Sequence, residues 1–323
     1  MRKDYCLCFN DCYVPYACVT IQSIMQHSKE NDEIVIHVLY DYLSDENIRF
    51  LKGYDVEFHI INERDKKILE GINTSIWSVY SLYRFFLPYY LSNVNKVLYL
   101  DCDVIVNSDL DELFGMDMGG VAVGGCIDLQ TYSEEVFTRL DYEYNKKYIC
   151  SGVLLMNLDY WRSYKLSTKI IDFMKKNSDK IKFPDQDALN YLCRDNKIVL
   201  EALYGVQTLF FLHKDFMIEH MEEMRMLIDK PSIVHYAGYP PWVYCKNKSM
   251  HSYLWWNTYK KLNAFHKVKR DYILSIAKYI CRYLFSTLHI ISCNNKYHIN
   301  QYYNHPRVKK NRVEKELKVL NQH

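Results

Sequence analysis

The first hundred residues alternate short apolar runs with segments of helical character, and this alternation constrains the fold more than any other feature. Runs that predict strands lie at 5–9, 34–39, 56–61 and 97–100. Such continuous apolar runs are typical of strands that are buried on both faces, and the run at 34–39 is rich in β-branched residues. Stretches at 15–27, 44–51 and 81–91 predict helices, the second with Ser44 as its N-cap. Strands that alternate with helices favour a largely parallel sheet, which binds ligands at the carboxyl ends of its strands.

The pattern loosens beyond residue 100 and ends in a basic tail. It predicts strands at 121–127 and 152–158, helices at 159–176 and 185–194, and a short strand at 233–235. From Lys260 onward there are 14 Lys and Arg against 3 Asp and Glu, although the whole chain carries a formal charge of only +2. We therefore predict a main domain at 1–258 and a basic amphipathic extension at 259–323.

Composition narrows the class of protein. Hydrophobic residues make up 49% and charged residues 25%, which fits a globular chain and excludes disordered and collagen-like ones. The 11 Cys include no Cys-x-x-Cys pair and mostly lie in apolar runs, so they predict small buried side chains in a reducing compartment. We find no apolar region of the length that a signal peptide or a membrane span needs, and expect a cytoplasmic protein.

The segment KVLYLDCDVIV, at 96–106, carries the strongest chemical signal. An apolar strand ends in Asp101 and Asp103, which an extended backbone would point to one side. Two carboxylates held together repel each other unless a cation lies between them. Oxygen ligands of this kind suit Mg²⁺ or Mn²⁺, with phosphate oxygens completing the shell. The alternative is a solvated acidic turn, which the apolar strand in front makes less favourable.

Two further segments could complete such a site. His235 follows an apolar strand and leads into the turn-rich sequence YAGYPPW, and imidazole is an acceptable third ligand for Mn²⁺. Asp185, Gln186 and Asp187 open a helix after Phe183-Pro184. Acids are favoured there by the helix dipole alone, but one Asp can serve the helix while its neighbours face a cleft.

Taken together, these segments resemble family 8 of the glycosyltransferases, which includes bacterial lipopolysaccharide galactosyl- and glucosyltransferases and the glycogenins. The matching blocks, in order, are YRFFLP (83–88), KVLYLDCDVIV (96–106), CSGVLLMNLDYWR (150–162), DQDALN (185–190) and HYAGYPPW (235–242). CFNDCY (8–13) lies where the first strand of the family meets uracil. The resemblance covers roughly residues 5 to 242.

The resemblance implies a GT-A fold, which is Rossmann-like with a mostly parallel sheet, and a UDP-sugar donor carrying glucose or galactose. It also implies Mn²⁺ or Mg²⁺ and transfer with retention of the anomeric configuration. Asp101, Asp103 and His235 would hold the metal. The catalytic residues would be Gln186, Asp185, Asp128 and Arg84. Donor contacts would come from Cys8, Asn10, Tyr13, Arg84, Asp101, Cys102, Asp103, Cys150, Gly152 and Gly238.

Two positions depart from the family pattern. Cys150 stands where the family usually has Asn, and the loop at 235–242 is one residue short and lacks the family's Lys. Lys246 or Lys248 could replace that cation. The departures leave open a catalytically impaired nucleotide-sugar-binding or scaffold protein. The complete set of Asp101, Asp103 and His235 favours the enzyme.

The basic tail predicts an amphipathic helix. Its polar positions Ser275, Lys278, Arg282, Ser286 and His289 recur every three or four residues, with apolar residues around them. Such a helix fits an anionic membrane surface at the inner face of the cell membrane, where a glycan or glycolipid acceptor would lie. Two alternatives are that the helix packs on the catalytic domain, and that tail aromatics stack on bases. We expect no nucleic-acid partner.

Overall fold

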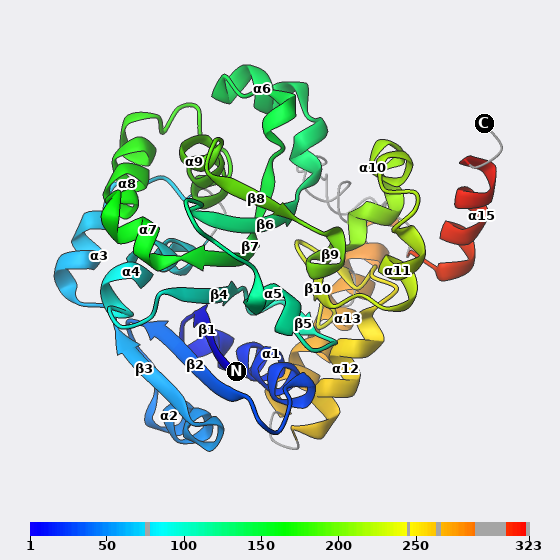
Figure 1. Ribbon diagram of the computed structural model, residues 1–323. Helices are drawn as coiled ribbons and strands as arrows, with labels where there is room; N and C mark the ends of the chain where they lie inside the picture. Colours follow the sequence, from blue (N-terminus) through cyan, green and yellow to red (C-terminus); the bar gives the residue numbers. More distant parts are fainter. Residues whose placement is uncertain (75–77, 244–245, 263–265, 288–307, 321–323) are drawn as a thin grey trace.

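The computed structural model describes residues 1–74, 78–243, 246–262, 266–287 and 308–320. Its centre is a seven-stranded sheet with the order β3-β2-β1-β4-β7-β6-β8 (Figure 1). The strands are β1 (Arg2–Cys8), β2 (Glu33–Tyr40), β3 (Val56–Ile60), β4 (Lys96–Leu100), β6 (Val123–Ile127), β7 (Ile149–Asn157) and β8 (Lys197–Leu200). Strand β7 runs antiparallel to its neighbours β4 and β6, and the other pairs are parallel. The predicted, mostly parallel α/β sheet is confirmed.

A second, three-stranded sheet lies beside the carboxyl end of β4. It has the order β5-β10-β9, from β5 (Val104–Val106), β10 (Ile233–His235) and β9 (Val206–Gln207). Strand β10 runs antiparallel to β5, and His235 pairs with Val104. This register brings residue 235 next to residue 103 although 132 positions separate them in the chain.

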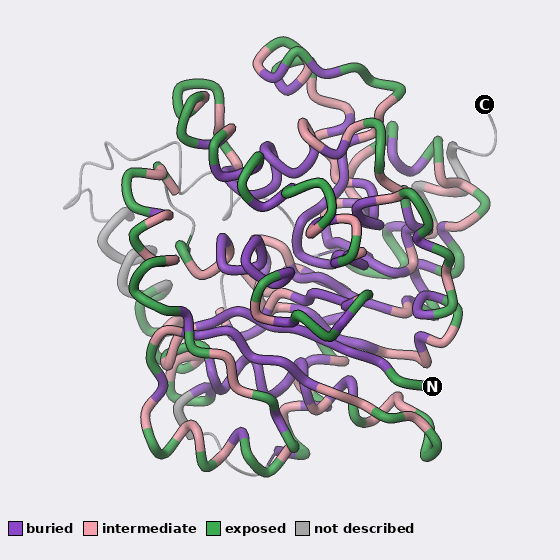
Figure 2. The backbone as a smooth tube through the Cα atoms, turned by 60° about the vertical axis from the view of Figure 1, so that its left-hand side comes forward, coloured by how far each residue is buried: buried purple, intermediate pink, exposed green. Residues whose placement is uncertain are grey.

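Helices cover both faces of the large sheet. The described helices are α1 (Val14–His27), α2 (Asp45–Leu51), α3 (Glu63–Leu69), α4 (Leu87–Tyr90), α5 (Asp111–Gly115), α6 (Glu134–Leu140), α7 (Leu158–Ser163), α8 (Leu166–Lys176), α9 (Pro184–Cys193), α10 (Lys214–Glu219), α11 (Met224–Asp229), α12 (Ser252–Lys261), α13 (His266–Thr287) and α15 (Lys310–Leu320). Helices α1 and α12 share one apolar cluster with the sheet, and α7, α8 and α9 share another on the opposite face. Figure 2 shows the central strands buried between these layers.

Local sequence signals account for many of the element boundaries. Ser44 caps α2, as predicted, with its hydroxyl accepting a hydrogen bond from the Asn47 amide at 3.4 Å. The helix predicted at 81–91 is wrong in type, because 79–86 forms a 3₁₀ helix and only α4 is α-helical. The helix predicted at 159–176 is two helices, broken where Lys165 adopts a φ of 50°.

The chain beyond residue 258 continues directly from the main body. The division predicted between 258 and 259 falls inside α12, and Val268 of α13 is buried in the same cluster as α1. Val308 and Val313 are buried against α10 and α11. Described parts of the extension therefore pack on the rest of the molecule. Within the described ranges, no helix combines the length and apolar character needed to cross a membrane.

Candidate functional site

The two acids of the Asp-x-Asp segment occupy a turn between two strands. β4 ends at Leu100 and β5 begins at Val104, so a turn rather than the alternation of a strand sets the directions of Asp101 and Asp103. The turn is held on both sides: the Asp101 amide donates to the Gly152 carbonyl at 2.9 Å, and the Tyr236 amide donates to the Asp103 carbonyl at 2.9 Å. Strands β7 and β10 therefore fix its position.

His235 completes a three-residue cluster with these acids. Its Nε2 lies 3.2 Å from Asp103 Oδ1 and 3.9 Å from Asp101 Oδ2, and the three ligand atoms lie within 4.8 Å of one another. Gly152 leaves the space beside them open, because a Cβ there would lie 2.2 Å from His235 Cε1 and 2.8 Å from Asp101 Oδ2. Two carboxylates and an imidazole in this arrangement fit a divalent cation.

Burial and the negative charge that is concentrated in this cluster both shift the pKa values of Asp101 and His235. Burial raises the pKa of Asp101, and the nearby charge of Asp103 adds to the rise. Burial alone would lower the pKa of His235, but the charge of Asp103 and the contacts with Asp103 and Cys150 outweigh burial and raise that pKa well above its usual value. The acids therefore stabilise positive charge at this point.

Arg84 lies beneath the acidic turn and is almost completely buried, with 1% of its surface exposed. Its Nη2 is 3.1 Å from Asp101 Oδ1 and 3.3 Å from Asp185 Oδ2, and its Nη1 donates to the Ser151 carbonyl. The guanidinium also lies over the ring of Tyr99, whose hydroxyl donates to Asp101 Oδ1 at 2.7 Å. Arg84 thus joins the Asp-x-Asp turn to the start of α9.

Helix α9 presents a second row of polar side chains. Gln186 Oε1 accepts a hydrogen bond from the Ser151 amide at 2.9 Å, which fixes the orientation of its amide group. Asp187 is fully buried and bonds to Arg139, to the Tyr148 hydroxyl and to the amides of residues 182 and 183. Asp187 therefore stabilises the start of the helix, while Asp185 pairs with Arg84 and Gln186 bonds to Ser151.

Cys150 contacts the imidazole of His235, and the buried Asp128 interacts electrostatically with the same ring. Cys150 Sγ is 3.5 Å from His235 Nδ1, and burial raises the pKa of its thiol. Asp128 accepts a hydrogen bond from the Gln130 amide at 2.9 Å, burial raises its pKa, and Gln186 and His235 are among the groups that act on it. Cys150 therefore adjoins the cluster, and Asp128 is electrostatically coupled to it.

The predicted nucleotide-contacting residues at the end of β1 lie near the same turn. Asn10 caps a short 3₁₀ helix by accepting from the Tyr13 amide at 3.2 Å. Partial burial raises the pKa of Tyr13, and the charges of Asp103 and Asp101 add to the rise. The side chains of Cys8 and Cys102 are buried in the two apolar clusters, so their positions differ from that of the exposed Tyr13 ring.

The segment after β10 forms a shaped loop, as predicted. Gly238 adopts a φ of 72°, which favours glycine, and the Tyr239 amide closes the turn on the Tyr236 carbonyl at 2.7 Å. Trp242 stacks on Tyr16 of α1 with the ring centroids 4.3 Å apart. The loop is therefore anchored at its end to the main body.

Sequence reasoning gave no role to Tyr99 or Asn190. The Asn190 amide bridges the backbone of Ile149, donating to its carbonyl at 2.7 Å and accepting from its amide at 2.8 Å, and it also donates to the Gln186 carbonyl. It fixes α9 against β7. The only local signal is a buried Asn four residues after Gln186, on the same helical face.

Solved structures identify the fold. The galactosyltransferase LgtC, solved in complex with donor and acceptor sugar analogues, matches with a TM-score of 0.72 and 24% identity over 83% of this chain and 99% of that one. The bifunctional glycosyltransferase WbbM matches with a TM-score of 0.69 and 20% identity, covering 84% of this chain and 51% of that one. The chain has the GT-A fold of nucleotide-sugar-dependent glycosyltransferases, as the sequence resemblance implied.

The family follows from comparison of sequences. The model of glycosyl transferase family 8 matches residues 5–246, and the chain belongs to that family. A lipopolysaccharide 1,2-glucosyltransferase of Escherichia coli is 27% identical over 79% of this chain and 80% of its own length. The glycosyltransferase GlyF of Streptococcus pneumoniae is 25% identical over 79% of this chain and 61% of its own length.

Proposed function

We propose that this protein transfers glucose or galactose from a UDP-sugar to a glycan acceptor, with retention of the anomeric configuration and with a divalent cation. The observation that carries the proposal is the convergence of Asp101, Asp103 and His235 beside the Arg84–Asp185 pair and Gln186. The names of the relatives support hexose transfer, since one is a lipopolysaccharide glucosyltransferase and one solved neighbour is a galactosyltransferase.

Asp101, Asp103 and His235 would hold Mn²⁺ or Mg²⁺, and the imidazole favours Mn²⁺. Such a cation neutralises charge on the departing diphosphate and orients the donor. For His235 to bind through Nε2, its Nδ1 proton must point to Cys150 Sγ, 3.5 Å away. Cys150 would thus select the ring tautomer, a task that sulfur performs weakly because it is a poor acceptor.

We assign the donor sugar to the space bounded by Arg84, Asp185, Gln186 and Gly152, and the uridine to Cys8, Asn10 and Tyr13. Gly238 would let the loop backbone approach the diphosphate, and Cys102 would contribute through its main chain because its side chain is buried. Asp128 would lie toward the acceptor. Lys246 or Lys248 would supply the cation that the shortened loop lacks.

The reaction breaks the bond between the anomeric carbon and a β-phosphate oxygen. Positive charge develops on the sugar, as in other oxocarbenium-like transition states. Gln186, a neutral amide held by Ser151, would lie near that carbon without acting as a nucleophile. The acceptor hydroxyl would attack from the same face and give its proton to the departing phosphate oxygen. A covalent intermediate on Asp185 is the alternative, and the ion pair with Arg84 makes that carboxylate a weaker nucleophile.

A catalytically impaired nucleotide-sugar binder remains the second candidate, because Cys150 replaces the usual Asn. A panel of UDP-hexoses with Mn²⁺ and no acceptor distinguishes the two: the enzyme slowly releases UDP by transfer to water, whereas a binder releases none. With an acceptor, an α-linked donor should yield an α-linked product by NMR coupling, and a β-linked product would refute retention.

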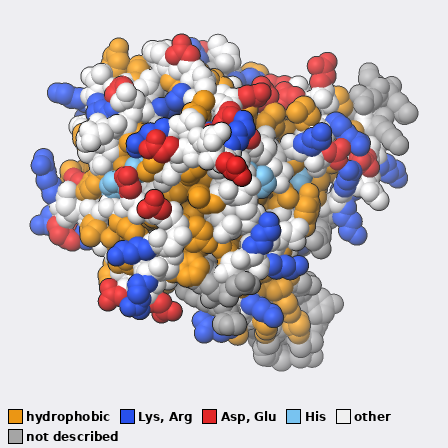
Figure 3. Space-filling view, turned by 60° about the horizontal axis from the view of Figure 1, so that its bottom comes forward, with side chains coloured by type: hydrophobic (Ala, Val, Ile, Leu, Met, Phe, Trp, Pro, Cys, Tyr) orange, Lys and Arg blue, Asp and Glu red, His pale blue; other side chains and the backbone are white. Residues whose placement is uncertain are grey.

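We further propose that the acceptor is lipopolysaccharide or another bacterial surface glycan, met at an anionic membrane through α13. Ile273 and Leu274 are 55% and 50% exposed there, next to exposed Lys269 and Arg270. An exposed apolar pair beside cations suits a lipid surface. Figure 3 shows hydrophobic side chains next to Lys and Arg along the lower edge of the molecule. Arg282, Ser286 and His289 of the predicted polar face lie outside the side chains that the structure describes.

A further inference from the structure

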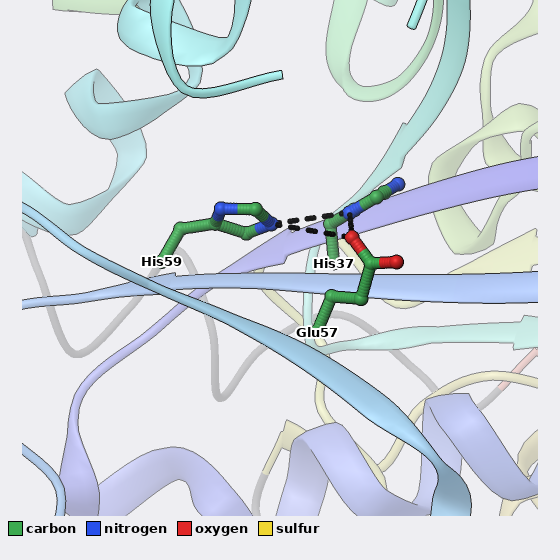
Figure 4. A group of neighbouring side chains, drawn as sticks. All are labelled: His37, Glu57 and His59. Carbon is green, nitrogen blue, oxygen red and sulfur yellow. Dashed lines mark hydrogen bonds and ion pairs between the residues drawn. The ribbon is translucent and has the colours of Figure 1, made fainter. Parts of the chain in front are cut away.

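A second cluster of potential metal ligands lies on the large sheet, away from the acidic turn. It consists of His37 on β2 and Glu57 and His59 on β3 (Figure 4). In the parallel register His37 pairs with Glu57, and Leu39 pairs with His59. His37, Glu57 and His59 therefore project from the same face of two neighbouring strands. Nothing in the proposed sugar transfer uses them.

The three side chains point their ligand atoms at one another. His37 Nδ1 is 3.1 Å from His59 Nε2 and 3.2 Å from Glu57 Oε2, and His59 Nε2 is 4.0 Å from the same Glu57 oxygen. His37 is 1% exposed and His59 18%, but Glu57 is 56% exposed. The inner side of the cluster is therefore buried, and its outer side, at Glu57, is open to solvent.

The other nitrogen of His37 has a partner of its own. His37 Nε2 is 3.0 Å from Asp4 Oδ1, and Arg2 holds that carboxylate with Nη2 2.9 Å from the same oxygen. A neutral His37 that donates from Nε2 to Asp4 has a lone pair on Nδ1. When the proton of the neutral His59 ring is on Nδ1, its Nε2 also carries a lone pair, and Glu57 contributes a carboxylate oxygen. In that tautomer, electron pairs from all three groups converge where a cation would satisfy them.

The ligand types select a transition metal. Two imidazole nitrogens and one carboxylate oxygen suit Zn²⁺, whereas Ca²⁺ and Mg²⁺ prefer all-oxygen sites. With metal–ligand lengths of about 2.0–2.1 Å, ligand atoms in a tetrahedral zinc site are roughly 3.3 Å apart. Two of the three separations are close to this value, and the third involves the exposed Glu57 side chain, which is free to approach. A carboxylate on the far nitrogen of a ligating histidine, as Asp4 is here, is the common outer support of such sites.

Another cluster, of three aspartates, shows that clustered carboxylates alone do not indicate a metal site. Asp32, Asp109 and Asp111 also lie together, but the buried ammonium of Lys3 contacts Asp32 at 2.6 Å and also contacts Asp111. That group already has its cation. Among the described residues, the histidine cluster is the group outside the acidic turn that contains nitrogen ligands and no lysine.

We propose that His37, Glu57 and His59 bind Zn²⁺ or a similar divalent transition metal, with water in the fourth position. The ion joins the edge strand β3 to β2 through side chains, in addition to the ladder of backbone hydrogen bonds. This site is separate from the cation of the acidic turn.

Zinc titration of the untagged, full-length, metal-stripped protein against a chromophoric chelator tests the proposal. Glu57→Gln and His59→Ala should each weaken one zinc site at least about tenfold, and Asp4→Asn about 10- to 100-fold. Asp103→Asn, which disables the acidic turn, should retain that site. His27→Gln is the matched control, since it removes a partly buried histidine outside the cluster.

Co²⁺ provides a second readout, because a tetrahedral site gives an intense visible absorption that Glu57→Gln should abolish. Zinc should also raise the melting temperature of the wild type more than that of Glu57→Gln. Melting in EDTA verifies that the variants fold. Equal zinc affinity and stoichiometry in wild type, Glu57→Gln and His59→Ala would overturn the proposal. So would a wild type whose zinc binding disappears entirely in Asp103→Asn, which would leave the cluster as a hydrogen-bonded group only.

Discussion

At the scale of single residues, the site depends on one buried cation and one neutral amide. Arg84 pairs with both Asp101 and Asp185, and it holds these two carboxylates in place. Burial alone would lower its own pKa, but the charges of Asp101 and Asp185 help to outweigh that effect and raise it. Gln186 lies beside this pair with no charge.

Replacing Gln186 by Ala should lower kcat by about 10- to 100-fold, or ~1.4–2.8 kcal/mol, and change KM much less. The amide would act mainly on the charge that forms during bond breaking. Gln26→Ala on α1 is the control, since Gln26 contacts Lys261 at the surface. Steady-state kinetics with the active UDP-hexose gives both constants. An effect confined to KM would assign Gln186 to ground-state binding.

Some residues of the site were predictable and others were not. Asp101, Asp103 and His235 stand at the ends of apolar runs, a signal that each segment carries by itself. Tyr99 and Asn190 contribute through contacts with residues distant in the chain, so no local pattern marks them. The same holds for His37, Glu57 and His59, which depend on the register of two strands.

At the scale of elements, most strands could be predicted because β-branched and apolar runs between turn signals are typical of buried strands. The two helix errors have physical causes. The 3₁₀ helix at 79–86 has an amphipathic pattern that periodicity does not distinguish from an α-helix. The break between α7 and α8 depends on the backbone of Lys165, a residue that seldom adopts a positive φ.

The contact of α9 with β7 makes Asn190 a positioning residue. Asn190→Ala leaves the amide and carbonyl of Ile149 buried without these partners, which should lower the free energy of unfolding by about 2–3 kcal/mol. It should also lower kcat, because Gln186 precedes it by one helical turn. Denaturant unfolding and kinetics measure the two effects. Asn177→Ala, at the end of α8, should leave kcat unchanged. Wild-type kcat in Asn190→Ala would contradict the positioning role.

Lys197 on β8 makes stability depend on pH. Burial lowers its pKa to about 8 from the usual 10.5. Between these values the unfolded chain binds more protons than the fold, so the free energy of unfolding should rise with pH in that window. Lys197→Met should lack this rise in the free energy of unfolding. Subtracting the free energy of unfolding of the variant from that of the wild type at each pH cancels the contribution of the other titrating groups. Urea unfolding at about pH 7.5 and 9.5 tests it. If the wild type and Lys197→Met differ in free energy of unfolding by the same amount at both pH values, the pKa of Lys197 is not lowered.

At the scale of the whole molecule, helices α13 and α15 of the basic extension pack on the catalytic domain through some residues. Other apolar residues of α13 remain exposed to solvent. Val268 of α13 and Val313 of α15 are buried, so these helices are anchored at certain points, whereas Ile273 and Leu274 face outward. The sequence predicted a helical, amphipathic tail. It could not predict which apolar residues pack on the body, because periodicity does not identify the partner of a face.

The full-length protein should therefore sediment with anionic vesicles at low salt. Ile273→Ser with Leu274→Ser, or Lys269→Glu with Arg270→Glu, should weaken this binding at least about tenfold, since each basic residue near the surface contributes about 1 kcal/mol. Ile218→Ser on α10, equally exposed, should not. Wild-type protein that stays in the supernatant would exclude the membrane proposal.

A divalent cation held by Asp101, Asp103 and His235 should support transfer from a UDP-hexose. The most direct measurement is UDP release from UDP-glucose and UDP-galactose by the protein in EDTA, and again after Mn²⁺ is added in excess. We predict no turnover in EDTA, recovery with Mn²⁺, and a loss of more than about 100-fold, or ~2.7 kcal/mol, in Asp103→Asn. Full turnover in EDTA, or a fully active Asp103→Asn, would show that the reaction does not depend on a cation at these residues.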